Sequence, residues 1–185
     1  MDSARHTLIT CRAACDARLS VAGSSEHPAA VLVSHDEPGL RILAIGQLET
    51  VGRHPAAAAA RRLDLPDDIV IPGLINAHTH LDLTVIGPQP HEPSDGFVAW
   101  VNRIRAHRPA ESDQIAASVH DGVRLSRAGG VVAVGDIPGA VRGSASLLAA
   151  DALRDTGMAG VSFAEFFALG ARAAQRAQHP LHPLR

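Results

Sequence analysis

Aromatic residues and cysteines are scarce in this sequence. Aromatic residues make up 3% of the 185 positions, with one tryptophan and no tyrosine, whereas 46% of the residues are hydrophobic. A core of this composition has to be built from aliphatic side chains. Cys11 and Cys15 are the only cysteines. A Cys-x3-Cys pair without further metal ligands favours two reduced structural thiols over a zinc site.

The sequence also lacks a strong charge imbalance and a long apolar run. The formal net charge of −2 provides no broad basic surface for nucleic acid. Residues 1–10 lack the apolar run of a signal peptide. No stretch approaches the roughly twenty apolar residues that a membrane span needs. We therefore expect a soluble, cytoplasmic protein that binds neither nucleic acid nor a membrane.

A segment that ends in two histidines organises the rest of the chain. Residues 69–75 are apolar and rich in β-branched types, which predicts a strand buried on both faces, bent or begun by Pro72 and Gly73. Side chains two positions apart in an extended chain point to the same side, so His78 and His80 are expected to be neighbours. Two neighbouring imidazoles can hold one divalent metal ion. The bare His-x-His spacing is also compatible with two ordinary surface or core histidines.

Strands and helices alternate after this segment. The pattern predicts helices over residues 97–104, over 112–128 and over 144–156, with the Gly129-Gly130 pair ending the second. Such alternation implies right-handed βαβ crossovers and a parallel sheet. We predict that three segments form neighbouring parallel strands with polar residues on one rim: 69–77 with His78, 130–136 with Asp136, and 159–166 with Glu165.

The N-terminal residues have a different pattern. Residues 1–68 alternate short β-like pieces with turns, which predicts a small β domain in the form of a partial sandwich with an uncovered face or edge. An alanine-rich segment, 56–62, is either a short helix or low-complexity filler. We divide the chain into this domain, residues 69–170 with the strands and helices above, and a flexible tail over 171–185. The candidate strands of the first domain are 8–10, 30–33 and 41–46.

The segment Pro-Gly-Leu-Ile-Asn-Ala-His-Thr-His-Leu-Asp, residues 72–82, resembles the first barrel strand of the amidohydrolase superfamily. The resemblance is greatest to the branch of cyclic deaminases and chlorohydrolases. It implies an α/β fold, an incomplete (β/α)8 barrel of about three βα units preceded by a small β-sandwich-like domain. It further implies that His78 and His80 are metal ligands, with zinc as the expected divalent metal and iron as the alternative.

The same resemblance implies candidate roles for three further residues. Trp100 is either a packed helix residue or a substrate contact in a pocket wall. Asp136 and Glu165 follow strands, on the barrel face where active sites lie, and are candidates for contacts with the substrate or with the metal ligands. The alternative for both is a solvated or helix-capping carboxylate. The role of Asp82 stays open, and no residue is assigned as catalytic acid or base.

The function that the resemblance implies is a metal-dependent hydrolase acting on non-peptide C–N or C–Cl bonds of cyclic small molecules. Complete enzymes of this kind take further metal ligands from later strands, and a full barrel needs about 250 residues. The alternative is therefore a truncated, catalytically inactive fragment, or a chain completed by a second copy or another protein. A metal-binding module without catalytic activity is a third hypothesis.

Overall fold

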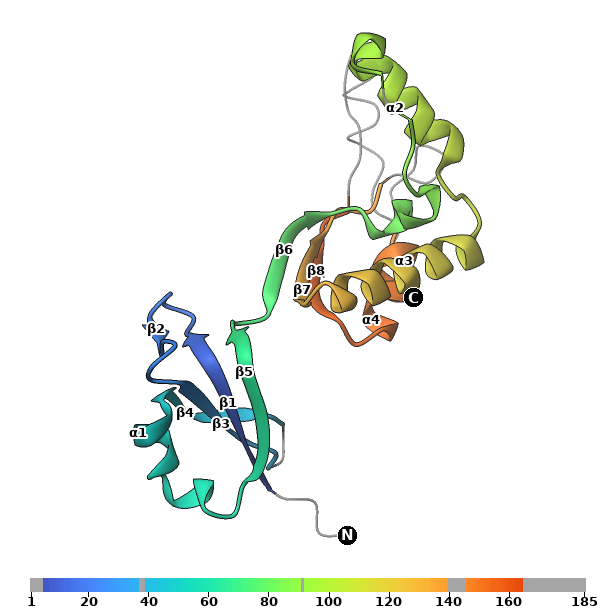
Figure 1. Cartoon of the computed structure of the whole chain (residues 1–185). Coiled ribbons are helices and arrows are strands. Elements are labelled where there is room, and N and C mark those ends of the chain that lie inside the picture. The colour runs from blue at the N-terminus through green and yellow to red at the C-terminus, as the bar shows by residue number, and fades with distance from the viewer. Residues whose placement is uncertain (1–4, 37–38, 91, 140–145, 165–185) are drawn as a thin grey trace. The chain divides into compact units, whose positions relative to one another are not determined.

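The computed structural model describes residues 5–36, 39–90, 92–139 and 146–164 (Figure 1). The chain splits into two compact units, Met1–Pro72 and Gly73–Arg185. The boundary expected after residue 68 lies inside strand β5 of the first unit. The tail expected over residues 171–185 lies outside the described residues. In the part of the chain that is described, no helix combines the length and apolar character needed to cross a membrane.

The first unit is built on one five-stranded sheet. The central strand β1 pairs antiparallel with β2 and β3, and on its other edge it pairs parallel with β5. β3 in turn pairs antiparallel with β4. The three candidate strands are confirmed as parts of β1, β3 and β4. The strands are β1 (His6–Cys15), β2 (Val21–Ala22), β3 (Ala29–Ser34), β4 (Arg41–Gln47) and β5 (Arg61–Val70).

The second layer of this unit is helical. The helix α1 (Leu48–Gly52) and the 3-10 turn η1 (Pro55–Ala57) place Val51 and Ala57 in one buried cluster with Leu8 and Leu32 of the sheet. Figure 1 shows α1 beside β3 and β4. A second sheet is not formed by the described residues of this unit, so the predicted sandwich is not confirmed.

Strand β5 was missed by the sequence analysis. Its residues Ile69 and Val70 pair with β1 rather than beginning the strand that carries the histidines. That strand, β6 (Leu74–Thr79), begins only after Pro72 and Gly73, because proline cannot donate a hydrogen bond to a ladder. The start of the predicted strand 69–77 was therefore wrong by five residues.

The second unit contains the expected parallel sheet. β6, β7 (Val131–Asp136) and β8 (Ala159–Ser162) pair in parallel in this order, as predicted. The connections contain α2 (Gly96–His107), α3 (Ser112–Ala128) and α4 (Leu148–Asp155), together with the 3-10 turns η2 (Leu81–Ile86) and η3 (Pro93–Asp95). The histidine end of β6 and Asp136 at the end of β7 lie at the same edge of the sheet, while Glu165 lies outside the described residues.

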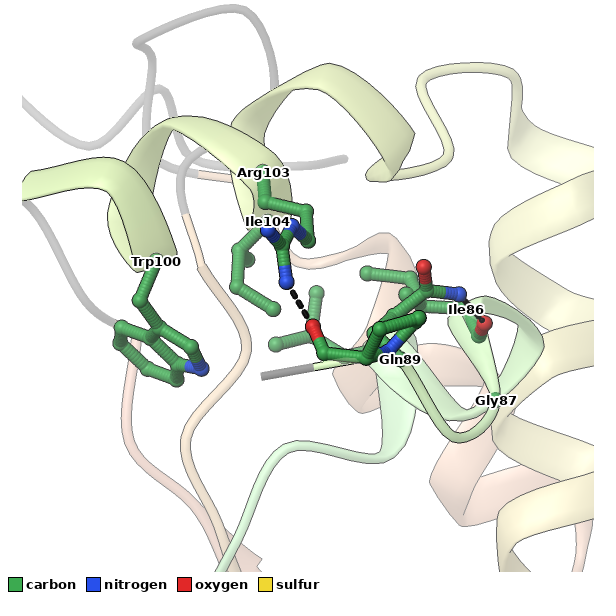
Figure 2. Close-up of a pocket in the computed structure, with 8 residues that line it drawn as sticks. Ile86, Gly87, Gln89, Trp100, Arg103 and Ile104 are labelled. Atoms are coloured by element: carbon green, nitrogen blue, oxygen red, sulfur yellow. Dashed lines mark hydrogen bonds between the residues drawn. The ribbon is translucent and has the colours of Figure 1, made fainter. Parts of the chain in front are cut away.

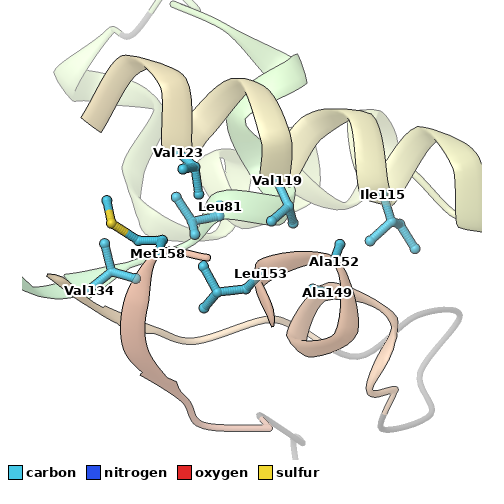
Figure 3. Close-up of a cluster of buried hydrophobic side chains, with 9 residues drawn as sticks. All are labelled: Leu81, Ile115, Val119, Val123, Val134, Ala149, Ala152, Leu153 and Met158. Atoms are coloured by element: carbon cyan, nitrogen blue, oxygen red, sulfur yellow. The ribbon is translucent and has the colours of Figure 1, made fainter. Parts of the chain in front are cut away.

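The core of the second unit lies between the sheet and the helices α3 and α4 (Figure 3). Ile115, Val119 and Val123, which follow one another at intervals of four residues in α3, are all buried. Gly130, with a φ of +79°, follows this helix. α4 begins at Leu148, which is 38% exposed, and buries Ala149, Ala152 and Leu153. The cluster comprises Leu81, Ile115, Val119, Val123, Val134, Ala149, Ala152, Leu153 and Met158.

Several apolar side chains of this sheet are exposed in the described part of the unit, and they include two consecutive residues of β6, which point to opposite faces of the strand. Leu74 is 49% exposed, Ile75 is 71% exposed and Val132 is 55% exposed. The prediction that the histidine strand is buried on both faces is wrong for this chain. An apolar strand sequence predicts a strand with two covered faces, but whether a partner layer is present is decided by the rest of the fold.

Candidate metal site

The two candidate ligands are neighbours at the C-terminal end of β6. The ring centroids of His78 and His80 are 5.3 Å apart and the rings are nearly perpendicular, at 77°. His78 is exposed and His80 is partly buried. His78 is the fifth residue of β6, and His80 lies just after its last residue. The strand therefore brings the two imidazoles together as the spacing predicts.

The ring of His80 is oriented by a backbone carbonyl. Its Nδ1 lies 2.6 Å from the oxygen of Ile137, the first residue after β7. A carbonyl oxygen only accepts hydrogen bonds, so Nδ1 carries a proton, and in the neutral imidazole Nε2 then keeps its lone pair. Metal-binding histidines are commonly held in this way by a hydrogen bond from the other ring nitrogen. The tautomer at His80 thus suits a metal bound through Nε2.

Asp136 anchors the backbone that follows His80. Its carboxylate is fully buried, at 0% exposure. Oδ1 accepts a hydrogen bond from the Leu81 amide at 2.9 Å, and Oδ2 accepts one from the Ser162 hydroxyl at 3.1 Å. Burial raises the pKa of this carboxyl, an effect that the hydrogen bond from Leu81 opposes. Asp136 is therefore a buried carboxylate, not a solvated one, and its hydrogen bonds link the end of β7 to η2 and to β8.

A second buried carboxylate, Asp82, lies in the turn η2. Its Oδ2 is 3.3 Å from Nη2 of Arg108, and it accepts a hydrogen bond from the Gly139 amide at 3.4 Å. Burial raises the pKa of Asp82, and the guanidinium of Arg108 opposes this shift. Arg108 was not singled out from the sequence. An arginine that follows a helix carries no pattern that would reveal a buried partner.

The turn η2 is also fixed by the helix α3. The hydroxyl of Ser118 lies 3.1 Å from the carbonyl oxygen of Leu81 and 3.0 Å from that of Asp82, and it accepts a hydrogen bond from the Val85 amide. Ser118 is 1% exposed. Its only signal in the sequence is a polar residue next to the apolar stripe of α3, and this signal was missed.

Trp100 lies beside a separate pocket of about 200 Å³ between α2 and the chain that follows η2 (Figure 2). The indole is 46% exposed and stacks on Phe97, with ring centroids 5.8 Å apart. Arg103 of the same helix donates a hydrogen bond to the carbonyl of Pro90. The pocket is lined by Leu83, Ile86, Gly87, Gln89, Pro90, Trp100, Arg103 and Ile104, and so includes neither candidate ligand.

The remaining sequence candidates do not complete a metal site. Within residues 5–36, 39–90, 92–139 and 146–164, no group of three or more His, Cys, Asp or Glu side chains is placed to hold a metal ion. Glu165 lies outside these ranges. Cys11 and Cys15 are free thiols in the first unit, as expected. The donor set is therefore the imidazole pair, which suits zinc and other transition metals.

Comparison with protein-family models and with curated proteins finds no match to this sequence. Solved structures with a similar fold include Helicobacter pylori aminofutalosine deaminase in complex with methylthio-coformycin, at a TM-score of 0.58 and 18% identity. Another is the atrazine chlorohydrolase TrzN from Arthrobacter aurescens complexed with zinc, at 0.60 and 18%. A third is Escherichia coli guanine deaminase, at 0.58 and 12%.

These neighbours are deaminases and chlorohydrolases of the amidohydrolase family. The matches cover 91%, 90% and 85% of this chain but only 37%, 37% and 35% of the three neighbours. The chain thus spans little more than a third of the length of the proteins that it matches. At these identities the likeness establishes the fold: a mixed α/β structure with a parallel sheet, similar to part of these hydrolases.

Proposed function

We propose that this chain provides part of a metal-dependent hydrolase that acts on non-peptide C–N or C–Cl bonds of cyclic small molecules. The observation that carries the proposal is the imidazole pair at the end of β6, in which His80 is held as the tautomer with a free Nε2. The neighbours' fold supports it, since they are deaminases and chlorohydrolases and one of them is complexed with zinc.

His78 and His80 would hold the metal as neutral imidazoles, and zinc is the metal that this donor type and the TrzN complex favour. When bound, such an ion supplies the Lewis acidity that activates water for attack on carbon. The chain's own contribution is to orient the ligands: Ile137 directs the His80 ring, and Asp136 fixes the backbone after it.

A catalytic zinc site generally has three protein ligands and a water. The described residues supply two imidazoles, so any further ligand has to come from other residues of this protein, a second copy or a different chain. We therefore expect the 185-residue chain by itself to bind zinc weakly and to show no turnover. Trp100 remains a proposed substrate contact, through the pocket that it lines.

The test is calorimetric titration of the metal-free chain with zinc, for the wild type and for His78→Ala and His80→Ala. We expect weak binding by the wild type and loss of it in both variants. His120→Ala is the matched control, because His120 is an exposed histidine of α3 and its loss should leave zinc binding unchanged. Wild-type affinity in both test variants would contradict the proposal.

The activity assay uses aminated and chlorinated purines, pyrimidines and triazines, with release of ammonia or chloride as the readout. We expect no release by this chain alone. Turnover that disappears in His80→Ala would mean that the chain completes its site by itself or through self-association. In that case the expectation of an incomplete site is wrong, while the assigned reaction class stands.

A further inference from the structure

We propose that Asp82 is a positioning residue: with Arg108 and Gly139 it fixes the peptide whose carbonyl orients His80, and so sets the direction of His80 Nε2. This inference rests on the proposed role of His80 as a metal ligand. Asp82 does not need to contact the metal or a substrate for this role. Its action passes through one backbone hydrogen bond and one ion pair, both of which are present in the structure.

The backbone on both sides of the Ile137 carbonyl is hydrogen-bonded to residues within two positions of His80. On its N-terminal side, the Ile137 amide donates to the Thr79 carbonyl at 2.8 Å. On its C-terminal side, the Gly139 amide donates to Oδ2 of Asp82 at 3.4 Å. The acceptor of the His80 ring is therefore tied to the residue before His80 and to the second residue after it. If the Asp82 contact is lost, only the hydrogen bond between Ile137 and Thr79 still holds the backbone next to this carbonyl.

Arg108 holds the carboxylate of Asp82 in place for this contact. The guanidinium Nη2 lies 3.3 Å from the same Oδ2 that accepts the hydrogen bond from Gly139. The Arg108 side chain is 16% exposed and that of Asp82 is 4% exposed, so the pair is almost entirely removed from water. Gly139 lies so close to the guanidinium of Arg108 that a Cβ added at this glycine would overlap it.

The energetics also favour an orienting role over a stabilising one. The free energy that is lost when two charges are removed from water is on the order of the free energy that their attraction returns. Two buried polar atoms of this ion pair, Asp82 Oδ1 and Arg108 Nε, also have no hydrogen-bond partner among the described residues. A buried pair of this kind contributes little net stability. It does fix a geometry, and this one lies where the orientation of His80 is set.

Two variants test the proposal in the full chain. Asp82→Asn removes the charge but keeps the size of the side chain. Gly139→Ala displaces the Arg108 guanidinium without removing any charged group, and Gly139 does not have a positive φ that alanine would disfavour. Asp121→Asn is the matched control, because Asp121 forms an exposed ion pair with Arg124 on α3.

The main readout is the tautomer of His80 in metal-free protein, measured by long-range nitrogen–proton correlation NMR and assigned with His80→Ala. We expect the Nδ1-protonated form in the wild type and in Asp121→Asn. In Asp82→Asn and Gly139→Ala we expect the His80 signals to shift toward a mixture of tautomers. Zinc affinity should fall in both test variants by about ten- to a hundredfold, as for other residues that orient a metal ligand.

A folded test variant that keeps the wild-type His80 tautomer would overturn the proposal, whatever its zinc affinity. If Asp82→Asn fails to fold, Gly139→Ala decides the result, since it disturbs only the end of a long side chain. The proposed function is tested separately. If His80→Ala binds zinc like the wild type while Asp82→Asn changes the tautomer, the metal role of His80 is wrong and the positioning role of Asp82 stands.

Discussion

Nδ1 of His80 lies 2.6 Å from the carbonyl oxygen of Ile137, although the two residues are 57 positions apart in the sequence. The spacing of the two histidines suits a metal, and this contact in addition fixes the tautomer of the neutral His80 ring. It also links the end of β6 to the loop after β7.

Metal removal should leave the fold intact. The buried cluster of the second unit is apolar and contains neither histidine, and a weakly bound ligand adds little to the free energy of unfolding. We expect the melting temperature and the far-ultraviolet circular dichroism to be the same with and without a chelator. A loss of helix on addition of the chelator would show that a bound metal stabilises the fold, which would contradict this prediction.

Ile115→Ala should destabilise the second unit strongly. Ile115 is 2% exposed in the cluster between α3 and α4, and truncating such a residue costs about 2–5 kcal/mol. Leu125→Ala, on the same helix at a site that is 54% exposed, should change stability by less than about 0.5 kcal/mol. Urea unfolding followed by circular dichroism measures both. Equal effects of the two substitutions would contradict the observed packing of α3.

Gly122→Ala should be destabilising despite the higher helix propensity of alanine. A Cβ at this position would lie 2.5 Å from Thr84 Oγ1 and 2.9 Å from Leu81 Cδ2, so α3 would be forced away from η2. The overpacking costs about 1–3 kcal/mol, which exceeds the gain of about 0.5–1 kcal/mol from removing a helical glycine. The control is Gly52→Ala in α1, where an added Cβ meets nothing within 4 Å. A more stable Gly122→Ala protein in thermal unfolding would disprove the close approach.

Asp136→Asn should change the pH dependence of stability. Burial raises the pKa of Asp136 above its ordinary value of 3.8, so the folded state binds this proton more tightly than the unfolded chain does. The contribution of Asp136 to the free energy of unfolding is therefore largest at low pH. It falls as the pH rises from 3.8 through the raised pKa of the folded state.

The asparagine variant lacks this contribution but can still accept a hydrogen bond from Leu81 and donate one to Ser162. Relative to the variant, the wild type should lose stability as the pH rises through this range. Urea unfolding at a series of pH values measures the difference. Parallel curves for the two proteins would show that Asp136 does not titrate differently in the folded state. Asp121→Asn, at an exposed site, should follow the wild type.

Much of the second unit could be predicted from the sequence because its signals are local. The 3.6-residue periodicity of Ile115, Val119 and Val123 predicts one buried helix face, and the glycine pair after Ala128 ends that helix. The strand–helix alternation predicts the parallel order of the three strands. The spacing of the two histidines predicts that they lie together.

The sequence by itself therefore determined the helices and strands around the candidate site, and the residue types that can bind a metal there. Only the tertiary structure decided which strand Ile69 and Val70 join, because the segment before them, residues 61–68, is rich in charged residues and contains a proline, and its partner β1 is more than fifty residues away. It also decided how His80 is oriented. The acceptor is a backbone carbonyl, which every residue has, and the Asp82–Arg108 pair forms only when η2 and the end of α2 pack together. Periodicity reports which faces are apolar, but the partners of buried polar groups are selected by the packed fold.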